Sequence, residues 1–247
     1  DFVDKSKSLQ ESVDWGLENL HKVTEGGDYF LWDGFDSTSL FGSYDVFEQS
    51  NAIYMFKNQL LKNRENYNKS YIAGKWFFGV DDNLGKSYDI PQSKWDKIKL
   101  SGINLGYTYM AKVYAWNKSG PPNINYYDGH QNRFLPTCTN KDIDITALCL
   151  SEIPESYEHN VRNDLLYMKH RKDIGNVISK LNYNVLTGYV ERKEYVEKLC
   201  RSKIIISPFG QGEICYRDIE TIHFGSLMIK PDMSMINTNP NIYINDE

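Results

Sequence analysis

The segment 203–232 constrains the fold more than any other part of the chain, because its pattern changes in a fixed order. That order is an apolar run (204–206), a glycine-bearing turn (207–212), a helical pattern (213–224) and a second apolar run (227–229). Strand, helix and strand in succession predict one βαβ unit. In such a unit the turn lies at the carboxyl end of the first strand, where open parallel sheets bind ligands.

Three charged side chains share one stripe of the predicted helix. Glu213, Arg217 and Glu220 have the spacing i, i+4 and i+7, and the stripe begins beside the glycine turn. Backbone N–H groups at a helix N-terminus favour an anion, and the guanidinium of Arg217 suits phosphate. The carboxylate of Glu220 can accept hydrogen bonds from ribose hydroxyls. On spacing alone, an exposed ladder of ion pairs explains the stripe equally well.

A second stripe of the same helix is apolar. Its members are expected to face the sheet, and they are Cys215, Ile219 and Ile222.

The segment 203–240 resembles the donor-site helix of exostosin-like glycosyltransferases. The resemblance rests on Ser207-Pro208 before the turn and on the run RDIETIHFG at 217–225, which is followed by an apolar strand. The version SPFG-x-GEICYRD-x-E most resembles members encoded by large DNA viruses of algae. The likeness is weaker from about residue 140, and before that it is confined to a short stretch near Asp33.

The resemblance implies a GT-B architecture, in which two Rossmann-like domains with parallel sheets face a central cleft that holds a nucleotide-sugar. Glu220 then matches the glutamate that binds the donor ribose, and Arg217 matches the arginine near the diphosphate. Retaining GT-B enzymes often carry two glutamates eight positions apart. Here Glu213 and Glu220 are seven apart and Thr221 fills the eighth position, which fits the exostosin-like pattern and leaves the role of Glu213 open.

The activity implied by the resemblance is sugar transfer. Exostosin-like members invert the anomeric centre and commonly use UDP-sugars, so the expected reaction joins a sugar from a UDP-sugar to a glycan hydroxyl. Xylose is one candidate sugar, and capsid glycan synthesis is the expected role of a viral member. GT-B enzymes usually stabilise the leaving group without a metal, so no metal or other cofactor is expected.

The expected domains are residues 1–120 on the acceptor side, a linker at 121–137, and the nucleotide-sugar-binding domain at 138–247. The linker is placed where turn-forming residues cluster and periodicity vanishes. In the second domain strands and helices alternate, which predicts a parallel sheet covered on both faces. Its expected elements before the βαβ unit are a strand at 142–150, a helix at 157–181, a strand at 184–187 and a helix at 191–203.

The first half is less regular, and we interpret it as a degraded Rossmann-like domain. Its expected elements are a helix at 9–20 and strands at 28–32, 71–73, 76–78 and 110–116.

Leaving-group stabilisation requires positive charge and N–H donors near the diphosphate. We expect these from Arg217 and from the turn, with Arg162 and Arg171 as secondary candidates that are more readily explained as ordinary surface arginines. The expected donor-binding residues are Ser207, Phe209, Gly210, Gly212, Glu213, Arg217, Glu220, Arg162 and Arg171.

The acceptor hydroxyl needs a base, and the first half must supply it if the cleft architecture holds. Asp33 and Asp36 follow a predicted strand, where loop residues reach the cleft, so they are the candidate catalytic residues. Asp33 is also followed by Gly34, and Asp-Gly is a plain turn signal.

Two other functions fit the sequence. The first is a carbohydrate- or nucleotide-binding protein without turnover. The second is a metal-dependent GT-A glycosyltransferase centred on Asp81 and Asp82, adjacent acids that could bind a divalent cation bridging a diphosphate. An Asp-Asp-Asn sequence is, however, more often a simple turn.

Charge and composition narrow the class of partner. The formal net charge of −5 disfavours a nucleic-acid partner. No apolar run approaches the length of a membrane span.

The cysteines lack the spacing of a metal site, and they are Cys138, Cys149, Cys200 and Cys215. We expect all of them to be reduced thiols and therefore a cytoplasmic location.

Overall fold

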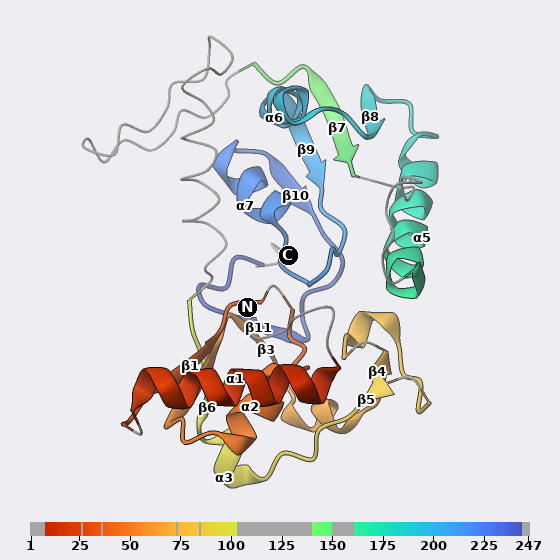
Figure 1. The fold of residues 1–247 in the computed structure, drawn as a ribbon. Coiled ribbons are helices and arrows are strands. Elements are labelled where there is room, and N and C mark those ends of the chain that lie inside the picture. Colours follow the sequence, from red (N-terminus) through yellow and green to blue (C-terminus); the bar gives the residue numbers. More distant parts are fainter. Residues whose placement is uncertain are drawn as a thin grey trace, which may run out of the picture. The chain divides into compact units, whose positions relative to one another are not determined.

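The computed structural model describes residues 8–25, 27–35, 37–72, 74–83, 85–102, 140–149 and 161–243. The chain forms two compact units, one built from Asp1–Ile103 with Ser234–Glu247 and the other from Asn104–Met233 (Figure 1). The sequence division placed all of 138–247 in one domain, whereas the segment from Ser234 belongs with the first unit. The predicted linker at 121–137 and the predicted strand at 110–116 lie outside the described residues.

The second unit is built on a parallel sheet of four strands in the order β10-β9-β7-β8 (Figure 1). These strands are β7 (Ile143–Leu148), β8 (Val185–Gly188), β9 (Ser202–Ile206) and β10 (Leu227–Ile229). The chain runs from β7 to β8 on one side and then crosses to β9 on the other. The strand order therefore reverses between β7 and β9, and the carboxyl end of such a switch point is where open parallel sheets bind ligands.

The helices of this unit cover both faces of the sheet. The helices that the structure describes there are α5 (Val161–Ile178), α6 (Arg192–Cys200) and α7 (Tyr216–His223). Neighbouring residues of β9 point to opposite faces: Ile206 packs with Ile178 of α5, and Ile205 packs with Leu199 of α6. The expectation of a parallel sheet with helices between its strands is confirmed for this unit.

Helix α7 differs from its prediction at both the start and the buried face. It begins at Tyr216 with Cys215 as N-cap, so Glu213 lies outside the helix and does not share a stripe with Arg217. Asp218, Glu220 and Thr221 are the buried helical residues, whereas Ile222 is 52% exposed. The expectation that Ile222 faces the sheet is therefore wrong.

The first unit also contains a parallel sheet, in the order β1-β2-β6. Its strands are β1 (Phe30–Asp33), β2 (Tyr54–Lys57) and β6 (Ile98–Leu100), and its main helices are α1 (Leu9–Thr24) and α2 (Ser43–Gln49). One core joins these elements. It includes Val13 of α1, Phe47 of α2, Leu31 of β1, Met55 of β2 and Ile98 of β6.

Shorter elements complete this unit. They are β3 (Gln59–Leu61), η1 (Arg64–Asn68), β4 (Tyr71–Ile72), η2 (Trp76–Phe78), β5 (Gly85–Lys86), α3 (Gln92–Trp95) and β11 (Ile236–Thr238). The predicted strand at 76–78 is wrong, because these residues form the 3-10 helix η2. Strand β11 pairs antiparallel with β3, which brings the chain back to the first unit.

Among the described residues, no helix is both long and apolar enough to cross a membrane.

Cys149 and Cys215 are free thiols, but Cys200 is disulfide-bonded. The expectation of reduced cysteines is therefore wrong at Cys200. The cytoplasmic assignment loses that support, because disulfides persist mainly in oxidising compartments.

Candidate functional site

Arg217 links helix α7 to the switch point of the second sheet. Its Nη2 donates a hydrogen bond of 2.8 Å to the backbone oxygen of Leu148, the last residue of β7. Its Nε is buried and has no hydrogen-bond partner among the described residues. The guanidinium is thus anchored through Nη2, while its buried Nε keeps a donor without an acceptor in the described part of the chain.

A pocket of about 220 Å³ opens beside this guanidinium. It lies at the carboxyl ends of β7 and β8 and at the start of α6, the edge of the sheet that the βαβ pattern predicts for ligand binding. Its lining residues are Leu148, Cys149, Gly188, Tyr189, Val190, Tyr195 and Arg217. Arg217, a predicted donor-binding residue, is thus placed at a cavity.

Glu220 is directed inward but does not line this pocket. Glu220 is only 2% exposed, and its Oε2 accepts a hydrogen bond of 2.6 Å from the hydroxyl of Tyr195. Burial raises the pKa of Glu220 to about 8, because desolvation disfavours the carboxylate. The sequence identified Glu220 but not Tyr195, which stands between it and the pocket.

The raised pKa of Glu220 predicts a change in pH-dependent stability. The ordinary glutamate pKa is 4.5, so between that value and about 8 the folded chain binds more protons than the unfolded chain. Stability should therefore fall as pH rises through this window, by up to about 1.4 kcal/mol per pH unit. In Glu220→Gln this contribution is absent, so its urea midpoint should fall less between about pH 5 and pH 8. If the urea midpoints of the two proteins change by the same amount with pH, Glu220 is not a buried carboxyl group with a raised pKa.

The turn after β9 is closely packed. Ser207, Phe209 and Gly210 are buried, and the N–H of Gly210 donates 3.0 Å to the oxygen of Gly212. A Cβ at Gly210 would lie 3.2 Å from Cys215 Sγ and 3.7 Å from Arg171 Nη2. Arg171 is therefore placed beside the turn.

The other predicted donor residues are placed less favourably. Glu213 is fully buried and precedes α7. Arg162 belongs to α5, but its side chain lies outside what the structure describes.

Asp218 holds the amino end of α7 in place, and it is not among the predicted donor-binding residues. Its carboxylate accepts hydrogen bonds from Ser207 Oγ at 2.5 Å and from Cys215 N at 2.9 Å, and it forms an ion pair with Lys230 Nζ at 2.9 Å. Ser207 follows β9 and Lys230 follows β10, so one buried carboxylate joins the helix to the ends of two strands. An Asp in the first helical turn is a capping signal in the sequence.

Lys230 also lies near the ring of Phe209, with Nζ 5.4 Å from the ring centroid. This cation-π contact holds the turn against the end of β10. Lys230 is therefore a second residue that was not predicted, because its burial depends on the ion pair with Asp218 and not on local periodicity.

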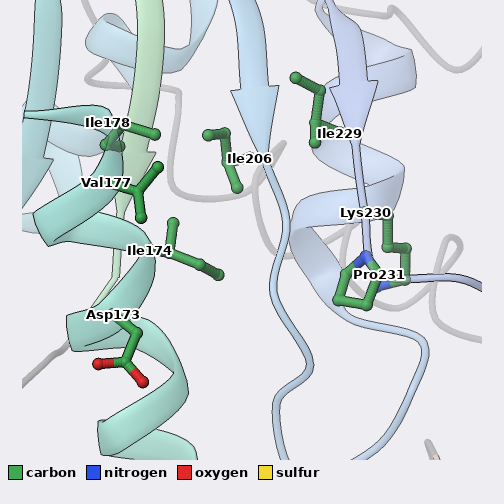
Figure 2. A pocket seen from close by; sticks show the side chains of 8 residues that line it. All are labelled: Asp173, Ile174, Val177, Ile178, Ile206, Ile229, Lys230 and Pro231. Atoms are coloured by element: carbon green, nitrogen blue, oxygen red, sulfur yellow. The ribbon is translucent and has the colours of Figure 1, made fainter. Parts of the chain in front are cut away.

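A larger pocket of about 330 Å³ lies between α5 and the ends of β9 and β10 (Figure 2). Its lining is mostly aliphatic, with charged groups only at Asp173 and Lys230. The lining residues are Asp173, Ile174, Val177, Ile178, Ile206, Ile229, Lys230 and Pro231. Lys230 is already paired with Asp218, so this pocket suits a diphosphate less well than the pocket beside Arg217.

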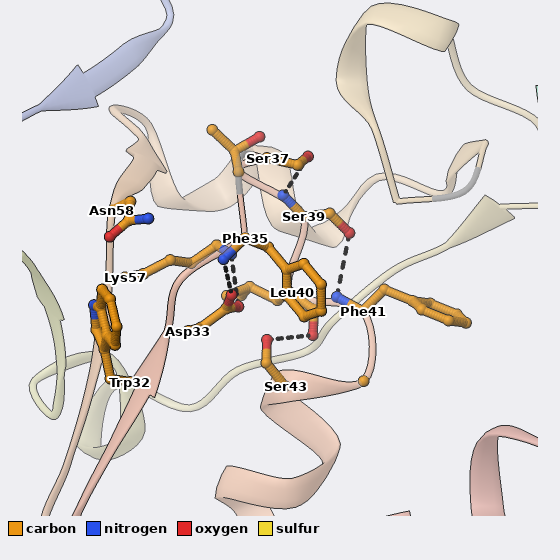
Figure 3. A network of polar contacts seen from close by, with 12 residues as sticks. Trp32, Asp33, Phe35, Ser37, Ser39, Leu40, Phe41, Ser43, Lys57 and Asn58 are labelled. Atoms are coloured by element: carbon orange, nitrogen blue, oxygen red, sulfur yellow. Dashed lines mark hydrogen bonds and ion pairs between the residues drawn. The ribbon is translucent and has the colours of Figure 1, made fainter. Parts of the chain in front are cut away.

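In the first unit, Asp33 is buried and engaged (Figure 3). Its Oδ2 lies 2.7 Å from Lys57 Nζ, and its Oδ1 accepts a hydrogen bond of 3.0 Å from the N–H of Phe35. Lys57 is itself fully buried at the end of β2. Asp33 thus lies at the carboxyl edge of a parallel sheet, as predicted. Its carboxylate is already engaged by an ion pair with Lys57 and by a hydrogen bond within the turn. Asp36, the other candidate base, lies outside the described residues.

Asp81 forms a local turn, in which its Oδ1 accepts a hydrogen bond of 3.0 Å from the N–H of Asn83. In the described part of the chain, no three His, Cys, Asp or Glu side chains are grouped so that they could hold a metal ion. The turn explanation of the Asp81 segment therefore has direct structural support.

The chain was compared with protein-family models and with curated proteins, and neither comparison gives a match.

Proposed function

We propose that the protein is a glycosyltransferase that moves a sugar from a UDP-sugar to a glycan hydroxyl with inversion. The observation that carries the proposal is the position of Arg217, which is anchored on Leu148 at the switch point and lines the adjacent pocket. Open parallel sheets bind nucleotides at this position. The exostosin-like pattern at 203–240 supplies the choice of a nucleotide-sugar among nucleotides.

In this proposal the protein stabilises the departing UDP by charge and N–H donors. The diphosphate gains negative charge as the sugar leaves, and a guanidinium already held in place stabilises that charge without reorganisation. The hydrogen bond from Arg217 to Leu148 holds the guanidinium in place beside the pocket that this residue lines. Arg171, which lies beside the turn at Gly210, supplies a second positive charge.

The finer parts of the proposal rest on the resemblance. They are a GT-B architecture of two Rossmann-like domains facing a central cleft, ribose recognition by Glu220, xylose as one candidate sugar, and a role in viral capsid glycan synthesis. No metal or other cofactor enters the proposal. A cytoplasmic location in a host cell follows from the viral resemblance alone.

One observation favours a second function, a nucleotide- or carbohydrate-binding protein without turnover. Asp33 is the one predicted base within the described residues, and Lys57 and Phe35 already engage its carboxylate. A carboxylate whose two oxygens are both engaged in this way is less available to a substrate hydroxyl. Release of UDP from UDP-xylose or another UDP-sugar separates the two functions, because a binding protein has affinity but releases no UDP.

Calorimetry with UDP and GDP tests the donor site. We expect UDP to bind the native protein more tightly than GDP. In Glu220→Ala we expect UDP affinity to fall by up to about tenfold, because a hydrogen bond to a neutral partner contributes roughly 0.5–1.5 kcal/mol. Circular dichroism confirms that the variant is folded. UDP binding that the substitution leaves unchanged would remove Glu220 from the site.

A further inference from the structure

Glu220 is inaccessible to a ligand in the structure as it stands. The residue is 2% exposed and is absent from the lining of the pocket beside Arg217. Direct contact between this carboxyl group and a hydroxyl of a bound nucleotide therefore requires a side chain to move.

Tyr195 is the side chain between the pocket and Glu220. It lines the pocket together with Arg217, and its hydroxyl donates the 2.6 Å hydrogen bond to Glu220 Oε2. One side chain thus lines the pocket together with Arg217 and contacts Glu220, the two residues to which the proposed function assigns the nucleotide.

The size of the pocket agrees with a closed arrangement. Its volume is about 220 Å³, whereas small-molecule sites typically enclose roughly 300–1,000 Å³. Tyr195 lies in the first turn of α6, where its N–H donates to the oxygen of Glu191, and Gly188 just before this turn has φ 93°.

We propose that Tyr195 is a gate over Glu220, whose hydroxyl occupies the position that a ribose hydroxyl takes when a nucleotide binds. The inference rests on the proposed function, since it names the residue that regulates access to the same site. Binding exchanges one hydrogen bond for another: the Tyr195 hydroxyl leaves Glu220 Oε2, and a ribose hydroxyl replaces it. Tyr195 is therefore a positioning residue that lowers affinity until it is displaced.

The test removes this hydroxyl and keeps the ring. In Tyr195→Phe the bond to Glu220 no longer has to be broken, so UDP affinity by calorimetry should rise roughly tenfold, the equivalent of one hydrogen bond. The 2′,3′-dideoxy analogue of UDP lacks the hydroxyls that would use Glu220, so its affinity should rise much less. Tyr183→Phe removes a hydroxyl from an exposed tyrosine outside the pocket and should leave both affinities unchanged.

The possible results of this experiment distinguish a failure of the gate proposal from a failure of the proposed function. If native protein binds UDP and Tyr195→Phe binds it equally or more weakly, the tyrosine supports the site and the gate is wrong. An equal gain for UDP and its dideoxy analogue also overturns the gate, because the gain then does not involve ribose hydroxyls. If neither protein binds UDP while both are folded by circular dichroism, the proposed function itself fails.

Discussion

Replacing Arg217 by methionine is expected to weaken UDP binding about a hundredfold, close to 2.7 kcal/mol. Methionine keeps the length and apolar stem of the side chain but removes the charge and every N–H donor. The loss includes the positive charge of the residue that lines the pocket and the Nη2 anchor on Leu148. Removing one partner of a buried charge-assisted contact commonly reduces affinity by about 2–5 kcal/mol. Calorimetry with UDP measures the effect.

Arg201→Met is the matched control for this substitution. Arg201 lies just after α6 and is paired with Asp142 and Glu197, away from the carboxyl edge of the sheet. The control changes the same charge and the same side-chain volume, so UDP affinity should stay close to that of the native protein. Equal losses in the two variants would mean that Arg217 contributes only general positive charge.

The second large effect concerns stability. Asp218→Ala should destabilise the second unit by about 3–5 kcal/mol, because it leaves the Lys230 ammonium buried without its carboxylate. The side chains of the pair are 5% and 0% exposed, and Asp218 also accepts from Ser207 Oγ and Cys215 N. A urea titration followed by circular dichroism measures the change in unfolding free energy.

A double substitution separates lost pairing from lost packing. In Asp218→Ala with Lys230→Met no buried charge is left without a partner, so part of the lost stability should return. If the double variant is as unstable as the sum of the two single variants, the ion pair is not the interaction that holds α7 to β10. A small effect of Asp218→Ala alone would contradict the burial of the pair.

Local pattern was sufficient to predict most elements of the second unit. The apolar run at 227–229 coincides with β10, and the predicted helix at 191–203 contains α6. These elements are specified by residues close to one another in the chain, and their period matches the burial that the structure gives them. The position of Arg217 at the sheet edge followed from the same βαβ pattern.

Long-range polar contacts explain the errors. Periodicity predicts a helix that begins at residue 213 and whose apolar stripe faces the sheet. Both predictions are wrong, because periodicity cannot show that Asp218 binds Lys230 and Ser207. The ion pair of Lys57 with Asp33 joins residues 24 positions apart, and local periodicity does not report it either. The pairing of β11 with β3 joins segments distant in the sequence, and no local signal reports it.

The most direct test of the central claim is hydrogen–deuterium exchange with and without saturating UDP. If a nucleotide occupies the edge of the second sheet, amides of 207–217 and the residues around Tyr195 should become protected. The same segments should remain unprotected in Arg217→Met. Protection confined to the first unit, or no protection at a UDP concentration that saturates binding, would contradict the assignment of this edge as the donor site.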